Sequence, residues 1–188
     1  SGAGVVLYHG SASFMDPHTL RVAAPSGDQI LRAGKILIAT GSAPVRPAEF
    51  AFEDERLCDS DEILHLRCLP ERLAVVGGGV IGSEYACTFA ALGVQVHLVD
   101  GRDRLLPFLD AEVAATLADS MGKLGIQFHW KERVQACEAP PGGGEVTLRL
   151  SSGNSLTADT VLVAAGRVSR TADLGLEAAG VTVGERGL

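Results

Sequence analysis

Apolar and polar positions form blocks along the chain, and the clearest block runs from Leu73 to Asp100. An apolar run at residues 73–76 meets a glycine-rich stretch at residues 77–82, which small and apolar residues follow. Gly93 then precedes a second apolar run, residues 94–99, which ends at Asp100. This pattern predicts a strand, a glycine turn, a helix, and a second strand that ends at an acid.

Short apolar runs between turn residues predict strands ahead of this block. Residues 5–10, 11–14, 19–22 and 29–31 are predicted to be short strands. Residues 35–41 form an apolar run that Gly41 ends, which is typical of a strand buried on both faces.

The stretch between these strands and the central block predicts a connection. Residues 42–47 are spaced by prolines, and Asp59 with Glu62 three residues later predicts the start of a helix that continues to about Arg67.

A second helix and a second set of strands are predicted after the block. Asp110 is expected to cap a helix whose apolar stripe is Val113, Leu117, Met121 and Leu124. The helix after the glycine turn is expected to pack with Ile81, Tyr85, Thr88, Phe89 and Leu92 in the core. Further strands are predicted at residues 126–130, 134–136, 146–150 and 161–166, with a possible strand at 181–183.

Two stretches of the chain repeat one succession of elements. Residues 4–41 and 125–166 each read as a short strand, a three-stranded meander, a buried strand and a glycine. The second copy follows a glycine motif and two strand–helix units, which the first copy lacks. We therefore expect the chain to begin inside a first nucleotide-binding domain and to be a fragment, although meanders are common and a chance likeness is the alternative. The predicted fold class is α/β, with a Rossmann-like parallel sheet and a three-stranded β-meander layer.

The glycine motif gives each of its conspicuous residues a physical task if it binds a dinucleotide. Gly77 would make the tight turn, Gly79 would let the backbone approach a pyrophosphate, and Gly82 would allow close packing of helix on strand. The pyrophosphate would lie at the helix N-terminus, where free N–H groups favour an anion. Asp100 lies where a carboxylate can accept hydrogen bonds from the adenosine ribose. An ordinary glycine-rich turn is the alternative interpretation.

Composition narrows the function classes. The chain has 188 residues and a net charge of −7, so it offers no basic surface for nucleic acid or anionic lipid. No apolar run approaches the roughly 18 residues of a membrane span, and the first ten residues do not resemble a signal peptide. The four cysteines form neither CxxC nor CxxxxC, so no metal site is expected; buried, inert thiols in a reducing cytoplasm are the expectation.

Three motifs taken together resemble the pyridine nucleotide-disulfide oxidoreductase family of two-dinucleotide flavoproteins. They are Ala39-Thr40-Gly41-Ser42 followed by prolines, the run from Val76 to Glu84, and Ala165-Gly166-Arg167 followed by Asp-Leu-Gly-Leu. Residues 59–64 and 102–110 are most similar to the members that pass hydride between NADPH and NAD. Dihydrolipoamide dehydrogenases share much of this pattern.

The resemblance implies a domain plan, cofactors and partners. Residues 1–45 would be the C-terminal portion of an FAD-binding domain, 46–70 a linker, 71–170 the NAD(P)-binding domain and 171–188 an exit segment. The cofactors would be NAD or NADP, and FAD in the full-length protein. The partners would be the nicotinamide dinucleotide and the FAD domain of the same protein, within a cytoplasmic homodimer, with no role for nucleic acid or membrane.

The resemblance also implies site residues. Glu84 matches a glutamate that lies near the flavin–nicotinamide contact and pairs with a lysine of the FAD domain; the alternative is a helix-dipole contact in the first turn. Val80 stands where many members have a tyrosine over the nicotinamide pocket, so no gating side chain is assigned. The expected cofactor-binding residues are Gly77, Gly78, Gly79, Val80, Ile81, Gly82, Asp100, Gly101, Arg102, Arg104, Gly166, Thr40 and Gly41.

The choice between the two nucleotides depends on Asp100 against Arg102 and Arg104. A carboxylate accepts from the 2′-hydroxyl of NAD and repels the 2′-phosphate of NADP, which an arginine can bind. NAD is favoured, and use of both nucleotides stays open. The alternatives for the whole are a dihydrolipoamide dehydrogenase-like disulfide oxidoreductase and a non-catalytic NAD-binding module. The fragment itself is expected to turn nothing over.

Overall fold

The computed structural model describes residues 4–187, which form two compact units. The larger unit is Pro44–Gly166, and the smaller unit combines the residues up to Ala43 with those from Arg167 onward. The strands β4 (Ser42–Pro44) and β13 (Arg167–Ser169) pair at this boundary.

A five-stranded parallel sheet forms the centre of the larger unit. Its order is β5–β12–β6–β7–β8, formed by Leu57–Asp59, Thr160–Val163, Arg72–Val76, Gln95–Asp100 and Gln127–Trp130. Helix α1 (Val80–Ala91) connects β6 to β7, and α2 (Ala111–Lys123) connects β7 to β8. The predicted order of strand, glycine turn, helix and strand is therefore confirmed.

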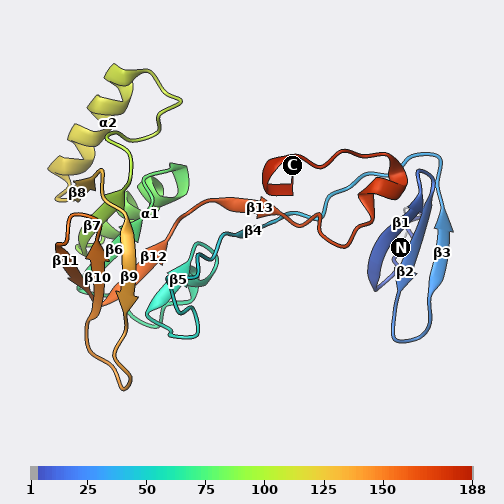
Figure 1. Cartoon of the computed structure of the whole chain (residues 1–188), viewed down its shortest axis with the longest axis horizontal. Coiled ribbons are helices and arrows are strands. Elements are labelled where there is room, and N and C mark those ends of the chain that lie inside the picture. Colours follow the sequence, from blue (N-terminus) through green and yellow to red (C-terminus); the bar gives the residue numbers. More distant parts are fainter. Residues whose placement is uncertain (1–3, 188) are drawn as a thin grey trace. The chain divides into compact units, whose positions relative to one another are not determined.

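Each face of this sheet packs against a different layer (Figure 1). On one face, side chains such as Leu73 and Leu98 join Phe89 of α1 and Met121 of α2 in one core. The other face is covered by the predicted antiparallel meander of β9 (Val134–Glu138), β10 (Val146–Leu150) and β11 (Ser155–Ala158). The three inner strands β12, β6 and β7 are largely buried on both faces, which explains why they read as nearly continuous apolar runs.

The smaller unit holds a second antiparallel meander. Its strands are β1 (Ser11–Asp16), β2 (Thr19–Ala23) and β3 (Gln29–Arg32), in that order. The short helix η2 (Leu176–Ala179) packs beside β1, where the Phe14 N–H donates to the Leu174 carbonyl, and η3 (Glu185–Gly187) ends the described chain.

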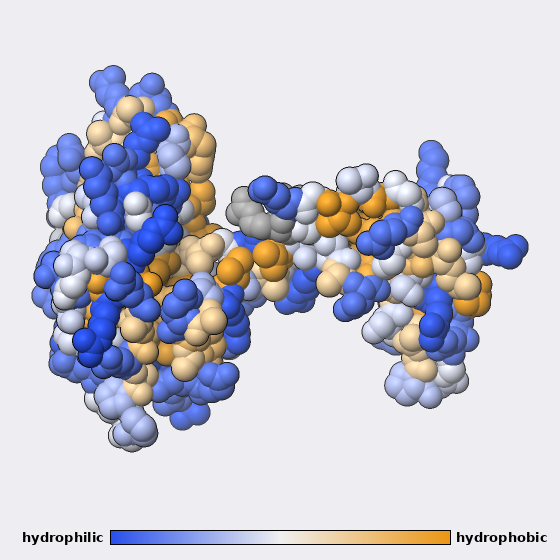
Figure 2. Space-filling view, in the orientation of Figure 1, coloured by the Kyte–Doolittle hydropathy of each residue, from blue (hydrophilic) through white to orange (hydrophobic). Residues whose placement is uncertain are grey.

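Many apolar residues of the smaller unit are exposed, and Figure 2 shows orange surface in the region of β1 to β3. The set comprises Val5, Val6, Leu7, Tyr8, Met15, Ile30, Leu37, Ile38, Val181 and Val183.

Three of the predicted strands are wrong. Residues 5–10, 35–41 and 181–183 do not form strands, and Leu37, expected inside a sheet, is 89% exposed. The apolar pattern favours burial, but a strand forms only beside another strand that takes up its N–H and C=O groups. Among the described residues, no strand pairs with these three segments.

The two helices bury narrower faces than their sequence pattern predicts. Val113 and Leu124 of the expected α2 stripe are 56% and 51% exposed, while Ala114 and Met121 are buried. Leu92, expected in the core, is 57% exposed, and Thr88 is also exposed. The core on this face takes Ala86 and Phe89 from α1 and Met121 from α2, so the other apolar side chains of the two helices lie at its margin.

The helix starts are predicted more accurately. The Asp110 carboxylate accepts from the Glu112 N–H at 2.9 Å, as a helix cap does. The Asp59 carboxylate accepts from the Asp61 and Glu62 N–H groups, and Glu62 accepts in return from the Asp59 N–H, but the N-cap residue of this helix is Asp61, two residues after the predicted one. The helix that follows is a single turn, η1 (Glu62–His65), and ends before Arg67. Within residues 4–187, no helix is long and apolar enough to cross a membrane.

Candidate functional site

The glycine turn between β6 and α1 is held by close packing on both sides. Gly77 has a φ of 112°, and a Cβ there would lie 2.5 Å from the Ala164 carbonyl oxygen at the end of β12. A Cβ on Gly82 would overlap the Gly77 carbonyl oxygen. Only glycine fits at these two positions, because one needs a left-handed backbone and both lack room for a side chain.

Gly79 differs from these two glycines. Its φ is −77°, which any residue adopts, and a Cβ would meet nothing within 4 Å. The packing of this chain therefore does not require glycine there. The Ser83 N–H donates to the Gly79 carbonyl at 2.9 Å, so α1 begins at this open position and its first N–H groups have no intrahelical partner.

Asp100 connects the end of β7 to the glycine turn. Its carboxylate is 5% exposed and accepts from the Gly78 N–H at 2.5 Å. It also accepts from the backbone N–H of Arg102 at 2.8 Å and from the guanidinium at 2.8 and 2.6 Å. Burial would raise the pKa of Asp100, but the bonds from Arg102 and Gly78 together outweigh burial and lower that pKa. The carboxylate is therefore charged and paired.

A pocket of about 470 Å³ opens beside this carboxylate, at the carboxyl ends of β6 and β7. The predicted residues Gly77, Asp100, Gly101 and Arg102 line it. Val99, Val134 and Ala165 supply part of its apolar wall. In open parallel sheets, ligands bind in a crevice at the carboxyl ends of the strands, next to the point where the strand order reverses. In this sheet β7 lies on one side of β6 and β12 lies on the other. The strand order therefore reverses at β6, and the pocket lies beside that point.

Sequence reasoning missed four polar or aromatic residues of this pocket. They are Glu49, Phe50, Glu132 and Arg133. The loops after β7 and β8 remain paired, since Lys131 N–H donates to the Arg102 carbonyl at 3.0 Å. This pairing brings the Arg133 side chain against Gly101, where an added Cβ would lie 3.2 Å from the Arg133 Nε. The signal for Arg133 in the sequence is a basic residue in the short connection between two predicted strands.

The other predicted site residues lie around or apart from the pocket. Arg104 donates to the Pro107 carbonyl at 3.1 Å and is not among the lining residues. Gly166 follows Ala165 and accepts from the Val45 N–H at 2.9 Å. Thr40 and Gly41 belong to the smaller unit, where Gly41 accepts from the Arg170 N–H. Their role in binding a cofactor stays a prediction.

Three further predicted residues lie on the first two turns of α1. Val80 is 49% exposed and Ile81 is half-buried. Glu84 is exposed and is the fifth residue of α1, so it lies on the second turn rather than the first. The dipole of a helix acts mainly on its first turn, so the helix-dipole interpretation of Glu84 is weakened.

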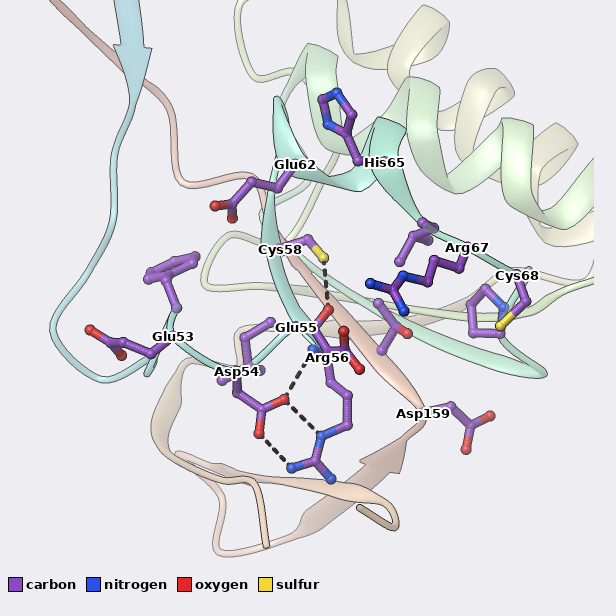
Figure 3. A pocket seen from close by; sticks show the side chains of 15 residues that line it. Glu53, Asp54, Glu55, Arg56, Cys58, Glu62, His65, Arg67, Cys68 and Asp159 are labelled. Carbon is purple, nitrogen blue, oxygen red and sulfur yellow. Dashed lines mark hydrogen bonds and ion pairs between the residues drawn. The ribbon is translucent and has the colours of Figure 1, made fainter. Parts of the chain in front are cut away.

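A larger hollow of about 600 Å³ lies at the opposite, amino ends of β5 and β12 (Figure 3). Arg56 and Asp54 form a two-bond ion pair at its margin, and the Cys58 thiol donates to the Glu55 carbonyl. Burial raises the pKa of Cys58 to about 11, so that thiol is protonated. These contacts hold the loop before β5 in place. Nucleotides bind at the carboxyl ends of the strands in such sheets, so this hollow at the amino ends is not the expected nucleotide site.

The cysteines only partly follow the expectation of burial. Cys58 is buried, Cys87 and Cys137 are half-buried, and Cys68 is exposed. In the part of the chain that the structure describes, no three histidine, cysteine or acidic side chains gather in a group that could hold a metal ion.

Comparison with known proteins agrees with this geometry. Residues 2–188 match the family described as pyridine nucleotide-disulphide oxidoreductase. The soluble pyridine nucleotide transhydrogenase of Colwellia psychrerythraea is 42% identical over 179 residues, which are 95% of this chain and 38% of that protein. The protein of the same name from Pseudomonas putida W619 is 44% identical over 97% of this chain and 39% of its own length. The chain thus spans about two fifths of these relatives.

Solved structures give the same result for the fold. The Cu(II) complex of the HOCl-induced flavoprotein disulfide reductase RclA from Escherichia coli has a TM-score of 0.83 at 33% identity, over 95% of this chain and 40% of that one. LpdA from Mycobacterium tuberculosis has a TM-score of 0.80 at 28% identity, over 94% of this chain and 39% of that one.

Proposed function

The chain belongs to the pyridine nucleotide-disulphide oxidoreductase family, and on that premise we propose that it is the nucleotide-binding part of an FAD-dependent enzyme. The proposed reaction is hydride transfer from NADPH to NAD by way of the flavin. The relatives named as transhydrogenases support this choice, since they match nearly the whole chain. We place the full-length protein in the cytoplasm as a homodimer.

One observation carries the proposal: the glycine turn leaves an open approach to the first N–H groups of α1, with the Asp100 carboxylate beside it. Gly77 and Gly82 are explained by packing within the chain, whereas Gly79 is not. A pyrophosphate at this position would account for a residue without a side chain there. The ribose hydroxyls would then lie toward Asp100 in the pocket.

The charges in this pocket support NAD as the preferred nucleotide, because the carboxylates of Asp100, Glu49 and Glu132 line it. The two guanidinium groups of the pocket support a secondary use of NADP. Asp100 can accept from the 2′-hydroxyl of NAD, and its charge would repel the 2′-phosphate of NADP. The Arg102 guanidinium is bound to that carboxylate and compensates part of its charge. Arg133 brings a second guanidinium to the same pocket, where it can pair with a phosphate. Arg104 is directed to Pro107 and is the weaker candidate.

Glu84 is the residue that we propose to act beside the nicotinamide. It is exposed on α1, one turn beyond the residues that would hold the pyrophosphate. Its partner would be a lysine of the FAD domain, and the pair would orient the nicotinamide ring. The nicotinamide itself supplies the hydride when it is bound.

The exposed apolar residues of the smaller unit support the proposed domain plan. A surface that carries Val5, Leu7, Ile30 and Leu37 in the open costs free energy unless another part of the protein covers it. We propose that the rest of an FAD-binding domain does so.

Disulfide reduction is the second candidate. It is favoured by the structural similarity to a flavoprotein disulfide reductase. That reaction requires a pair of reactive cysteines close in sequence, and the four cysteines of this chain are widely separated. The pair would have to come from another part of the protein.

The decisive experiment uses the full-length protein and follows hydride transfer after mixing with NADPH and then NAD. We expect a flavin absorption band that NADPH bleaches and NAD restores. Glu84→Gln should slow the bleaching by at least about tenfold with nucleotide affinity retained, as for loss of one positioned charged group. The matched control is Asp119→Asn, an exposed acid on α2, which should change neither property. A protein without flavin, or one that reduces only disulfides, would contradict the proposal.

A further inference from the structure

Hydrogen bonds fix the short loop between β8 and β9 at both of its sides. Lys131 turns the chain with a φ of 58°, a left-handed conformation that few residues other than glycine adopt. The Glu132 N–H donates to the Asp100 carbonyl at 3.1 Å. The Arg133 N–H donates to the Ser151 hydroxyl at 3.1 Å, and the Arg133 carbonyl accepts from the Ser151 N–H at 2.9 Å. The loop is therefore attached both to the end of β7 and to the turn between β10 and β11.

The Glu132 carboxylate closes this network. Its Oε2 atom accepts from the Ser151 hydroxyl at 2.7 Å and from the Ser152 N–H at 3.0 Å. The Ser151 hydroxyl thus donates to Glu132 while it accepts from the Arg133 N–H. Hydrogen bonds from Ser152 and Ser151 lower the pKa of Glu132, so this carboxylate is charged at neutral pH. Glu132 and Ser151 together fix the backbone from which the Arg133 side chain extends.

The Arg133 side chain lies across the end of β7. A Cβ added to Gly101 would be 3.2 Å from Nε, 3.3 Å from Cγ and 3.4 Å from Cζ of Arg133, so this side chain runs along Gly101. In the part of the chain that the structure describes, no hydrogen bond or ion pair engages the Arg133 guanidinium. The Arg102 guanidinium, in contrast, is bound to the Asp100 carboxylate. Of the two guanidinium groups that line the pocket, that of Arg133 is the one open to a ligand.

A phosphate on the adenosine ribose would need this cation. The pocket is lined by three carboxylates, those of Glu49, Asp100 and Glu132, which repel a phosphate. If the ribose hydroxyls lie toward Asp100, a 2′-phosphate lies at the strand end that Arg133 crosses. A 2′-hydroxyl carries no charge, so the adenosine of NAD does not depend on Arg133.

We propose that Glu132 and Ser151 are positioning residues, which hold Arg133 across Gly101 so that its guanidinium pairs with the 2′-phosphate of NADP(H). The inference rests on the proposed function for the identity of the ligand. It adds the residues that determine whether the pocket accepts the second nucleotide. The carboxylate of Glu132 would thus support phosphate binding through the position of Arg133, although its own charge opposes that binding.

The test measures the binding of adenosine 2′,5′-bisphosphate and of AMP to the full-length protein by titration calorimetry. The two compounds differ only in the 2′-phosphate, and neither carries a nicotinamide, so the result does not depend on hydride transfer. Arg133→Gln should lower the affinity for the bisphosphate by at least about tenfold, as for loss of a charge-assisted hydrogen bond. Its affinity for AMP should not change.

Two substitutions of Glu132 separate position from charge. Both remove a negative charge from the pocket, but Glu132→Gln keeps an oxygen that can accept from Ser151 and Ser152. We expect Glu132→Ala to lower the affinity for the bisphosphate by about threefold, as for loss of one hydrogen bond, and Glu132→Gln to retain or raise it. Ser151→Ala should behave as Glu132→Ala does. Ser155→Ala, an exposed serine at the start of β11, is the matched control and should bind as the parent does.

Unchanged affinity for the bisphosphate in Arg133→Gln, or an equal loss of affinity for AMP, would overturn the inference. Equal gains in Glu132→Ala and Glu132→Gln would also overturn it, since Glu132 would then act through its charge alone. A parent protein that binds neither compound would overturn it whatever the hydride-transfer assay shows. If the expected differences appear in a protein that transfers no hydride, the proposed function fails and this inference stands.

Discussion

Alanine at Gly82 and at Gly79 should separate folding from nucleotide binding at a single turn. At Gly82 the new methyl group would overlap the Gly77 carbonyl oxygen and lie 3.3 Å from the Ala164 Cβ. These neighbours are the backbone of the turn and the end of β12, which cannot swing aside as a flexible side chain does. The start of α1 would therefore have to retreat from the sheet by at least about 1 Å in a region packed as densely as a crystal.

The expected cost follows from this overlap. Overpacking of a core costs about 1–3 kcal/mol, and the higher helix propensity of alanine returns up to about 1 kcal/mol. Because the overlap involves backbone atoms, we take the upper end of this range and expect Gly82→Ala to lower the free energy of unfolding of the larger unit by about 2 kcal/mol after the offset. Denaturant titration followed by circular dichroism measures this loss.

Gly79→Ala is the matched variant, because it adds the same methyl group three residues earlier with open space around it. Its free energy of unfolding should stay within about 0.5 kcal/mol of the parent value. Its affinity for NAD, measured by calorimetry, should fall, because the methyl group stands where the pyrophosphate approaches. Two results would refute this reasoning: full stability in Gly82→Ala, or unchanged NAD affinity in Gly79→Ala.

Three further predictions follow from contacts in the larger unit. Asp100→Asn should lower the free energy of unfolding by about 1.5–3 kcal/mol, because it weakens the charge-assisted hydrogen bonds of a buried carboxylate. Arg104→Ala is the control and should change the free energy of unfolding by less than about 0.5 kcal/mol. Urea titration measures both values. The free energy of unfolding should fall as the pH drops below about 6.5, the ordinary pKa of histidine. In the folded chain the pKa values of His97 and His129 are lowered, so the unfolded chain takes up more protons in this pH range. A variant with glutamine at both positions should show a flatter dependence of stability on pH. Arg56→Ala should lower the free energy of unfolding by about 1–3 kcal/mol, because it removes the guanidinium donor to two carbonyls of the β9–β10 turn and leaves the Asp54 carboxylate with the backbone N–H of residue 56 alone. Hydrogen exchange should rise in that turn.

The central block was predictable because its pattern is local. A strand, a glycine turn and a helix are written in consecutive residues, and the requirement for glycine at positions 77 and 82 follows from that succession. The Asp110 cap and the hydrogen bonds between Asp59 and Glu62 are local in the same sense.

The errors arise where the outcome depends on distant residues. The run at residues 35–41 has the composition of a buried strand, but strand formation depends on neighbours that its own sequence does not specify. The pocket beside Asp100 is completed by Phe50 and Arg133, which come from loops far apart in the chain. The bond from the Gly78 N–H to Asp100 likewise joins two strand ends that only the folded sheet brings together.

That bond has a consequence for recognition. A glycine-rich loop is ordinarily mobile, and a ligand that must order it loses part of its binding free energy in doing so. Here the hydrogen bond from the Gly78 N–H to the buried Asp100 carboxylate holds the loop against β7. The loop is therefore ordered when the chain folds and not when the ligand binds. The cradle is thus preorganised, and an incoming dinucleotide meets a surface that already has its final shape.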